Sequence, residues 1–413
     1  AVGMNRRITV KYCFLQGGYW TLAAVAMAFT TPLLEAKGFS GTEIGILSAV
    51  KYLAVLIFQM VLGSFADKHA EKVPLQRMLI LMTFVNIIFS FLFYLTGHTM
   101  WMAMLTLIVF GMTIHCASPL VDSLSIQYMN HGVKMNYAIS RACGSLCWAV
   151  FCVVVGLIAD AFGTNRILIF QIVVSFLFAF FAFNMDAVDF SKERKKEEKT
   201  EDEDLASENS DTECETGEVH SCFYLLKHFP KYSLFLLGLV FVFAAYNMNS
   251  TFLIDWIEGM GGNHADYGMA QFVLAMAEIP VALVFYRIRG RVSIDKLMVV
   301  CAFFCFLRAT ATTFSGSVTL VILSQALELL GLSIYYVGTV YFVMDYLPQA
   351  DAVKGASLIN LAGMGLGEMA GSISCGLIKD AFGLRNLMLL SSGVGFVGVV
   401  VMVWMWRSGK EYN

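Results

Sequence analysis

The stretch GLIADAFGTNRILIF at residues 156–170 returns as GLIKDAFGLRNLMLL at residues 376–390, which is 220 positions later. Eleven of the fifteen positions match or nearly match, and chance is a poor explanation for that agreement. Each copy follows one long apolar run and precedes another, so the two copies occupy equivalent places in the chain. The repeat therefore predicts two similar halves with the same orientation.

The composition places both halves in a membrane. Of the 413 residues, 58% are hydrophobic and only 14% are charged, whereas soluble proteins carry about 25% charged residues. A water-soluble fold of this length could not bury so much apolar surface in one core. The composition thus excludes a soluble enzyme, a nucleic-acid binder and a disordered protein. The sequence also lacks an enzyme motif and the glycine-rich loop of a nucleotide-binding site.

Apolar runs long enough to cross a bilayer define the expected architecture, because a transmembrane helix needs about 20 such residues. Twelve runs are present, at 12–34, 42–64, 76–96, 100–127, 136–160, 166–186, 231–255, 264–286, 294–314, 317–345, 354–377 and 384–407. We expect an all-α membrane protein with twelve transmembrane helices in two pseudo-symmetric six-helix bundles. The bundles would comprise residues 1–186 and 231–413, and residues 187–230 would link them. This is the architecture of the major facilitator superfamily.

Charged residues indicate how the chain is oriented. Residues 186–218 hold 14 acidic and 5 basic side chains, a composition typical of a disordered linker. Lys and Arg gather in the connections on the same side as this linker, and few lie on the other side. Because cytoplasmic loops are enriched in Lys and Arg, we expect a cytoplasmic linker and cytoplasmic termini. The expected location is a bacterial-type inner membrane, with the protein as a monomer in the lipid bilayer.

The connection after the second run reads GSFADKHAEK at 63–72. It resembles the G-x-x-x-D-[RK]-x-x-x-[RK] signature of the major facilitator superfamily. Gly63 would let two helices approach closely. Asp67, followed by Lys68, can sit against the positive end of a neighbouring helix and lock the outward-open state. We therefore expect these three residues to act in gating.

Ionisable residues inside the apolar runs are costly, at about 2.5–3.5 kcal/mol each. The chain has several of them, among them Lys51, His115, Asp122, Arg141, Glu278, Arg308, Glu328 and Glu368. Asp122 and Arg141 lie at one depth in the first half. Glu278, Arg308 and Glu328 share a depth in the second half. Two such clusters, one in each half, favour a functional role over structural ion pairing.

The fourth and fifth runs contain SPLVD at 118–122 and RACGSLCW at 141–148. These segments resemble the Pro-x-Val-acid and Arg-x-x-Gly-x-x-x-Trp patterns of the lactose-permease, or oligosaccharide:proton symporter, family. The resemblance implies that Asp122 and Arg141 hold sugar hydroxyls, while Trp148 stacks on the sugar ring. This chemistry is sound on its own terms, because carboxylates and guanidinium groups suit hydroxyls and an indole face suits C–H groups.

The same resemblance extends to the second half. Glu278 and Arg308 match the acidic residue and the Arg that this family has on its eighth and ninth spans. Glu328 stands where the family has a His, and Gly331 stands at its proton-carrying Glu. Because a buried carboxylate beside an Arg can change protonation when its surroundings move, we expect Glu328 with Arg308 to carry the proton. Glu278 is the alternative proton carrier.

Other polar residues within the runs are weaker candidates for substrate binding. They are Gln16, Tyr19, Lys51, His115, Asn247 and Asn360. Helix–helix hydrogen bonding is the competing interpretation for several of them. The ten cysteines lie mostly in apolar runs, and no His pattern accompanies them, so we expect neither a metal site nor a cofactor other than the coupling proton.

These features together predict a transporter rather than an enzyme. The leading hypothesis is proton-coupled import of a small molecule, a sugar or glycoside, by alternating access. A proton symporter for nucleosides or for a small organic or aromatic acid is the alternative. Drug efflux is disfavoured by the charged clusters in both halves and by the sugar-type Trp.

Overall fold

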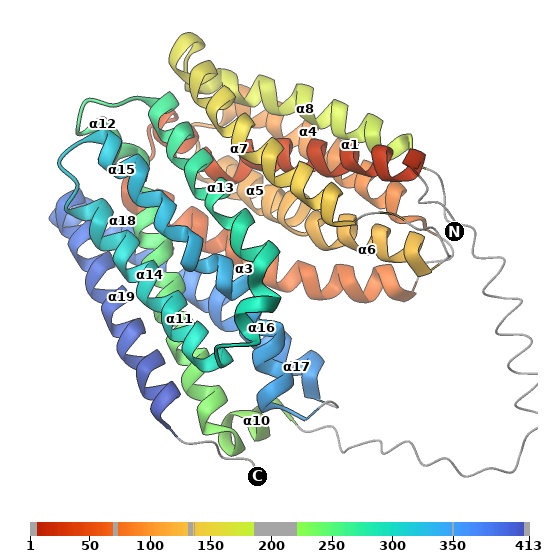
Figure 1. Ribbon diagram of the computed structural model, residues 1–413. Helices are drawn as coiled ribbons and strands as arrows, with labels where there is room; N and C mark the ends of the chain where they lie inside the picture. The colour runs from red at the N-terminus through yellow and green to blue at the C-terminus, as the bar shows by residue number, and fades with distance from the viewer. Residues whose placement is uncertain are drawn as a thin grey trace, which may run out of the picture.

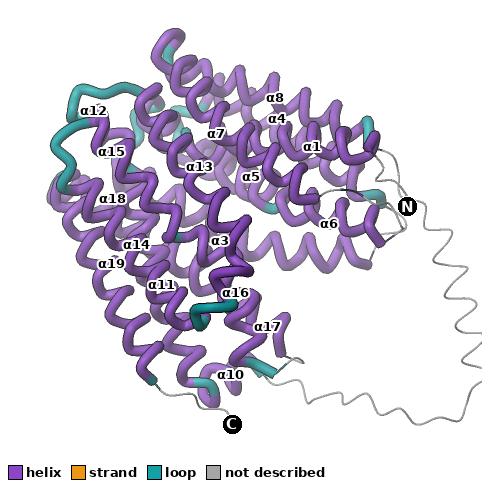
Figure 2. Tube along the Cα trace, viewed as in Figure 1, coloured by secondary structure: helices purple, strands orange, loops and turns teal. Residues whose placement is uncertain are grey.

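The structure is a computed structural model that describes residues 6–68, 73–130, 135, 137–185, 221–348 and 351–408. Every regular element in these ranges is helical (Figure 2). The helices form two bundles, one from each half of the chain (Figure 1). Buried hydrophobic side chains form two clusters. The first lies mainly in residues 12–185 and extends into the second half at 248–270, Val321, Cys375 and Leu387, and the second lies in residues 225–405.

The first bundle follows the predicted runs in order, with two of its spans broken. Its elements are α1 (Arg6–Ala23), η1 (Ala24–Ala28), α2 (Thr30–Ala36), α3 (Gly41–Lys68), α4 (Leu75–Thr96), α5 (Met100–Phe110), η2 (Gly111–His115), α6 (Ala117–Asn130), α7 (Tyr137–Phe162), η3 (Thr164–Arg166) and α8 (Ile167–Phe183). The segments η1 and η2 are single turns of π-helix, a feature that is frequent at functional sites.

The second bundle is preceded by a short helix, α10 (Cys222–His228). Its own elements are α11 (Pro230–Thr251), α12 (Leu253–Glu258), α13 (His264–Arg289), α14 (Ile294–Thr313), α15 (Val318–Ser324), η4 (Gln325–Leu330), α16 (Leu332–Tyr346), α17 (Ala352–Asn360), η6 (Leu361–Gly367), α18 (Glu368–Phe382) and α19 (Leu384–Arg407). The short helix α10 lies within the last part of the segment 187–230 that was expected to link the two halves. Ser221 caps α10 by accepting a hydrogen bond from the Tyr224 N–H, and this gives residues 222–228 helical structure.

Nine helices in the described ranges are long and apolar enough to cross a membrane. The other three predicted spans are also helical, as α1 with α2, as α13 and as α14. Charged residues lie within α1, α13 and α14, and the first span is interrupted at Phe29 between η1 and α2. The expected all-helical membrane fold is thus confirmed. Of the twelve predicted spans, nine meet the length and composition expected of a membrane span within the described ranges.

The tenth predicted span is broken where its buried acid lies. The Glu328 carboxylate accepts a hydrogen bond from the Leu332 N–H at 2.8 Å, and the Ser333 hydroxyl donates to the Glu328 carbonyl at 2.6 Å. These bonds replace part of the helical ladder between η4 and α16, which meet at Gly331. Because unsatisfied backbone groups are costly inside a membrane, a break here needs such a side chain.

The two bundles meet at one end and diverge toward the end where the N-terminus lies (Figure 1). At the closed end, α7 lies along α13 and α3 lies along α18. Glycines allow these contacts, since a Cβ at Gly156 would clash with the His264 carbonyl and a Cβ at Gly45 with the Ser372 carbonyl. Backbones can approach this closely only where small residues line the helices.

A buried ion pair ties α11 to α14 in the second bundle. Lys231 Nζ lies 2.7 Å from Asp295 Oδ2, and both side chains are less than a tenth exposed. The Tyr346 hydroxyl donates to the same carboxylate oxygen at 2.7 Å. Removal of the acid would leave a buried ammonium without its counter-ion.

Asp295→Ala should therefore lower the free energy of unfolding by about 3–5 kcal/mol, as expected for breaking a buried pair. Asp345→Ala is the matched control. Its carboxylate pairs with Arg289 at 2.7 Å but is 37% exposed, so its loss should cost less than about 1 kcal/mol. Unfolding in detergent, followed by circular dichroism, measures both variants. Equal losses would contradict this account of the pair.

Candidate functional site

Asp122 lies at the centre of a polar network in the first bundle. Its Oδ1 accepts hydrogen bonds from Gln16 Nε2 and from the Tyr137 hydroxyl, each at 3.0 Å. Gln16 also donates to the Tyr12 hydroxyl at 3.0 Å, and Tyr12 donates to the Val121 carbonyl at 2.8 Å. The network joins α1, α6 and α7, so Asp122 is held in place before any substrate arrives.

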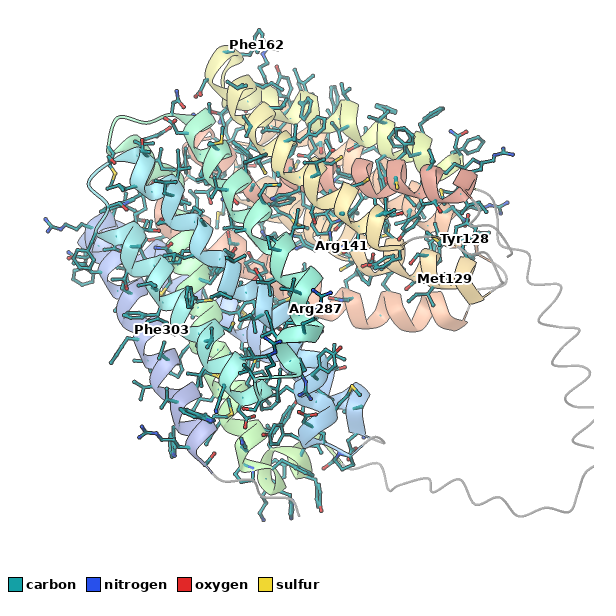
Figure 3. All side chains as sticks on the ribbon, viewed as in Figure 1. Tyr128, Met129, Arg141, Phe162, Arg287 and Phe303 are labelled. Carbon is teal, nitrogen blue, oxygen red and sulfur yellow. The ribbon has the colours of Figure 1, made fainter. Side chains whose placement is uncertain are left out.

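Trp20 connects this network to Arg141. The indole Nε1 donates to Gln16 Oε1 at 3.0 Å, and the Arg141 guanidinium lies 4.4 Å from the centre of the Trp20 ring. Trp148 packs edge-on against the same ring at 5.8 Å. Gly144 makes room for this arrangement, because a Cβ there would clash with Trp20. Two indoles and a guanidinium therefore lie together where α7 faces α1, and Figure 3 labels Arg141 on α7.

Asp122 and Arg141 do not form a direct ion pair among the described contacts. Asp122 bonds to Gln16 and Tyr137 instead, and Arg141 donates to the Ser145 hydroxyl at 3.2 Å. Gln16 and Trp20 stand between the two charges. We name the set Gln16, Trp20, Asp122, Arg141 and Trp148 the first-bundle site.

The second bundle holds a buried charge pair at Arg308 and Glu328. Arg308 Nε lies 3.3 Å from Glu328 Oε2, and the two side chains are 1% and 0% exposed. Arg308 also donates to Gln325 Oε1 at 2.8 Å and to the Ser250 hydroxyl at 3.3 Å. Its guanidinium lies over the Tyr246 ring at 4.4 Å. The Leu332 N–H bonds to Glu328 Oε1, whereas Oε2 has the nearby Arg308 as a counter-charge but accepts no hydrogen bond.

Glu278 on α13 lies between the two sites. It interacts electrostatically with Arg141 of the first bundle and with Arg308 and Glu328 of the second. Among the described residues, no hydrogen bond or ion pair reaches its carboxylate. Glu278 is therefore the acid that is free to take a partner from either side.

A further group of polar residues, which we call the seam cluster, lies where α3 meets the second bundle. It comprises Lys51, Tyr52, His115, Asn247 and Glu368. Lys51 is 4% exposed, and its Nζ lies 4.6 Å from the centre of the Tyr52 ring. Asn247 donates to the Tyr52 hydroxyl at 3.4 Å. Glu368 interacts electrostatically with Lys51 and with Tyr52. The cluster thus joins the two halves.

Several predicted residues have other surroundings. Tyr19 is 1% exposed and donates to the Ile114 carbonyl at 3.0 Å, so it holds α1 against η2. His115 packs against the Tyr52 ring at 6.2 Å. Asn360 is exposed at the end of α17. Gly63, Asp67 and Lys68 lie near the end of α3, and their side chains are outside the described part of the chain.

Sequence reasoning missed some members of these sites. Tyr52 and Tyr137 belong to no motif, and only the fold brings them to Glu368 and Asp122. Gln325 could have been noticed, because an amide inside an apolar run needs a partner as an acid does. Trp20 had a signal in its position four residues after Gln16, which places both on one helical face.

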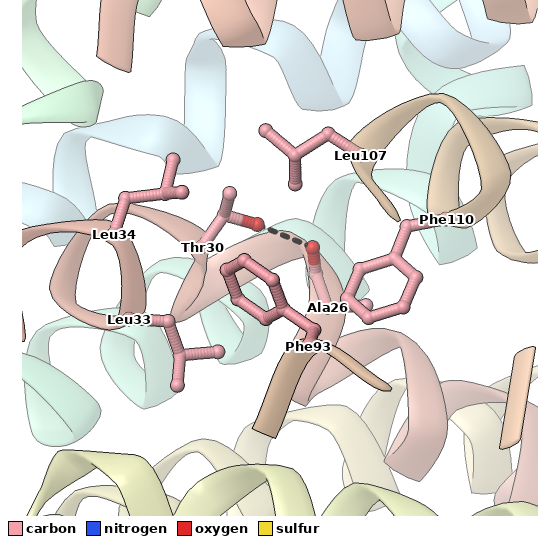
Figure 4. Close-up of a pocket in the computed structure, with 7 residues that line it drawn as sticks. All are labelled: Ala26, Thr30, Leu33, Leu34, Phe93, Leu107 and Phe110. Carbon is pink, nitrogen blue, oxygen red and sulfur yellow. Dashed lines mark hydrogen bonds between the residues drawn. The ribbon is translucent and has the colours of Figure 1, made fainter. Parts of the chain in front are cut away.

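A small apolar pocket in the first bundle is separate from these sites. Ala26, Thr30, Leu33, Leu34, Phe93, Leu107 and Phe110 line it (Figure 4). Its only drawn hydrogen bond runs from the Thr30 hydroxyl to the Ala26 carbonyl within the first span. Such a lining offers no recognition of a polar solute. No cluster of three or more metal-binding side chains lies in the described ranges.

Residues 12–390 match the MFS_1 like family. The chain belongs to that family. No curated protein matches the chain significantly. Among solved structures, a mutant of the nucleoside transporter NupG is similar with a TM-score of 0.81 and 14% identity, over 97% of this chain and 100% of that one. Unmutated NupG gives 0.78 at 14% identity, over 98% and 100% of the two chains.

An auto-inhibited peptide transporter of the POT family is similar at a TM-score of 0.70 and 10% identity, over 98% of both chains. At these identities the likeness shows the fold, which is that of the major facilitator superfamily. The MFS_1 like chain is accordingly a multi-pass membrane protein with transporter relatives. The recognition expected from the repeat and the Gly63 signature is confirmed at the level of the superfamily.

The indole pair gives a direct test of the first-bundle site. Trp148→Ala should weaken binding of the transported solute by about three- to tenfold, the range expected from the loss of one aromatic contact, while the protein stays folded. Trp101→Ala is the matched control, because that indole is 78% exposed on the surface. Binding by purified protein is measured calorimetrically. Unchanged affinity in the Trp148 variant would remove the stacking role.

Proposed function

We propose that this MFS_1 like protein is a proton-coupled symporter that imports a neutral sugar or glycoside by alternating access. The observation that carries the proposal is the first-bundle site. There a pre-positioned carboxylate, an amide and a guanidinium lie beside two indole rings. The same polar groups that bond to one another in this conformation can exchange partners with the hydroxyls of a ring.

The mixture of groups supports a neutral solute with hydroxyls. Asp122 accepts hydrogen bonds, Arg141 donates them, and Gln16 does both, so adjacent hydroxyls of a sugar find a partner of each kind. The indoles of Trp20 and Trp148 suit the apolar face of the ring. An ionic solute would require an unbalanced charge in this site, whereas Asp122 and Arg141 balance each other.

The charge balance of the interior supports coupling to protons. Four carboxyl groups lie in and between the sites described above. Asp122 belongs to the first-bundle site, Glu328 to the Arg308 pair and Glu368 to the seam cluster, and Glu278 is the fourth. With the His115 imidazole counted as neutral, the same sites contain three cations, at Lys51, Arg141 and Arg308. One carboxylate therefore lacks a cation, and a net buried charge is costly in a membrane protein. A bound proton is the simplest cation that restores the balance.

Within this scheme Glu328 carries the proton. Here Arg308 and the Leu332 N–H lie against its carboxyl group, and both contacts favour the charged form that is expected after proton release. A movement of η4 relative to α14 within the second half, tied to the change of access, would separate the carboxylate from Arg308 and leave it to take up a proton. Glu278, which has no partner among the described residues, is the competing carrier. The end of the molecule that bears the linker would face the cytoplasm of a bacterial-type cell, with the protein acting as a monomer.

A nucleoside is the second candidate substrate. It combines a hydroxylated ribose with a planar base, and the base would stack on the indole pair and Arg141 as readily as a sugar ring does. The likeness of this chain to the NupG structures, titled as those of a nucleoside transporter, supports keeping this class. The known solute of those proteins does not decide between the two candidates.

Uptake into proteoliposomes decides the substrate class. Radiolabelled neutral sugars and glycosides, nucleosides and sugar acids are offered under an imposed inward proton gradient. The proposal expects accumulation of a neutral sugar or glycoside and none of the acids. Accumulation of nucleosides alone would establish the second candidate. Accumulation of acids alone would contradict both.

Neutralisation of the two acids separates the proton carriers. Glu328→Gln should abolish accumulation against a gradient but retain solute exchange, because exchange needs no net proton movement. Glu278→Gln is compared side by side and should still accumulate solute. The measurements are gradient-driven uptake and counterflow with the same vesicles. If only the Glu278 variant loses accumulation, Glu278 is the carrier and the assignment to Glu328 is wrong.

A further inference from the structure

The repeated motif that defines the two halves contains an aspartate in each copy, Asp160 and Asp380. Asp160 is near the end of α7 in the first bundle, and its carboxylate bonds to the first turn of α13 in the second. Its Oδ1 accepts from the His264 N–H at 3.0 Å and its Oδ2 accepts from the Ala265 N–H at 2.8 Å. The His264 ring also contacts Oδ1 at 3.1 Å.

Asp380 makes the equivalent contact in the opposite direction. It is near the end of α18 in the second bundle, and its carboxylate bonds to the first turn of α3 in the first. Its Oδ1 accepts from the Gly41 N–H at 3.1 Å and its Oδ2 accepts from the Thr42 N–H at 2.6 Å. Gly41 allows this approach, because a Cβ there would stand 2.6 Å from Oδ1. In both cases one carboxylate bonds to the first two N–H groups of a helix that belongs to the other half.

In each of the two helices, the third N–H group bonds to a side chain that precedes the same helix in the chain. The Asp266 N–H of α13 is satisfied by Asn263 Oδ1 at 3.0 Å, and the Glu43 N–H of α3 by Ser40 Oγ at 3.3 Å. The first four N–H groups of a helix have no partner inside it. The first and second N–H groups of each helix, in contrast, have their hydrogen-bond acceptor in the opposite half. A separation of the halves at this end would leave those groups to water.

We propose that Asp160 and Asp380 are a matched pair of positioning residues that latch the closed end of the transporter, each by capping a long helix of the opposite half. The carboxylates add a favourable interaction with the positive ends of the α13 and α3 dipoles. Opening of this end to admit a solute breaks both caps, and reclosure after solute entry reforms them. The inference rests on the alternating-access part of the proposed function.

The charge at this end is otherwise asymmetric, which distinguishes the latch from a general salt-bridge surface. Lys379, next to Asp380, pairs with Glu35 Oε1 at 2.7 Å and with Asp255. The first copy of the repeat has Ala159 at the position of Lys379. Among the charged contacts described at this end, the aspartate and its bonds to a helix start occur in both copies of the repeat, whereas the ion pairs of Lys379 occur in one copy.

Spin labels at two exposed positions of the closed end test the proposal. Phe162 and Phe314, 73% and 71% exposed, belong to opposite halves. Pulsed electron paramagnetic resonance on the full-length protein in nanodiscs gives the distances between the labels. Asp160→Asn, Asp380→Asn and the double variant replace one acceptor oxygen with an NH2 group that would face a helix N–H donor. Asp266→Asn and Glu43→Gln are the matched controls, because they remove the same charge at the same helix starts without crossing between halves.

Each latch variant should raise the population with the longer, open distance relative to the population with the shorter, closed distance. The expected increase is about 2- to 30-fold, the range that corresponds to loss of a helix N-cap. The double variant should show the product of the two effects, because the sites are separate. The controls should retain the distribution of the unsubstituted protein. A double variant with an unchanged distribution, or controls that open as far as the latch variants, would overturn the proposal.

If the double variant does not fold, the two single variants give the same test. The measurement needs neither solute nor proton gradient. A failed uptake panel together with a shifted distance distribution would therefore reject the proposed substrate and retain the latch. The reverse result would reject the latch alone.

Discussion

The cost of holding a charge inside an apolar bundle controls the interior of this protein. The surrounding hydrocarbon cannot solvate a charge, so each ionisable group needs a partner from a neighbouring helix or the backbone. Arg308 and Glu328 provide one another's counter-charge and use Ser250, Gln325 and the Leu332 N–H for the remaining bonds. The break between η4 and α16 follows from this arrangement. The acid takes over a backbone N–H that a continuous helix would have satisfied.

The same constraint links structure to transport. A group that is satisfied only in one arrangement of the halves resists movement, and a group that can exchange its partner for a solute or a proton permits it. Asp122 and Arg141 are held by neutral groups and an aromatic ring rather than by each other, so a polar solute can replace those contacts. Glu278 remains between the two sites without a partner in the described residues. Binding and conformational change thus act on the same few side chains.

Much of the fold could be predicted from the sequence, because long apolar runs and a repeat at 156–170 and 376–390 are direct consequences of membrane insertion and internal symmetry. The depth of Arg308 and Glu328 within their runs correctly placed them together. The π-helical segments and the break at Gly331 could not be predicted, since they depend on tertiary bonds. The roles of Tyr52 and Trp20 likewise required the packing of separate helices. The repeat contains Asp160 and Asp380, but only the structure shows the helix starts that they cap.

The central claim is that movement of a neutral solute is tied to movement of a proton through this interior. The most direct measurement is the pH of a lightly buffered medium when neutral sugars, glycosides or nucleosides are added to proteoliposomes that contain the unsubstituted protein. The account predicts that the medium becomes more alkaline with each solute that enters, because protons enter with it. Entry of the solute with no change in external pH would contradict the account.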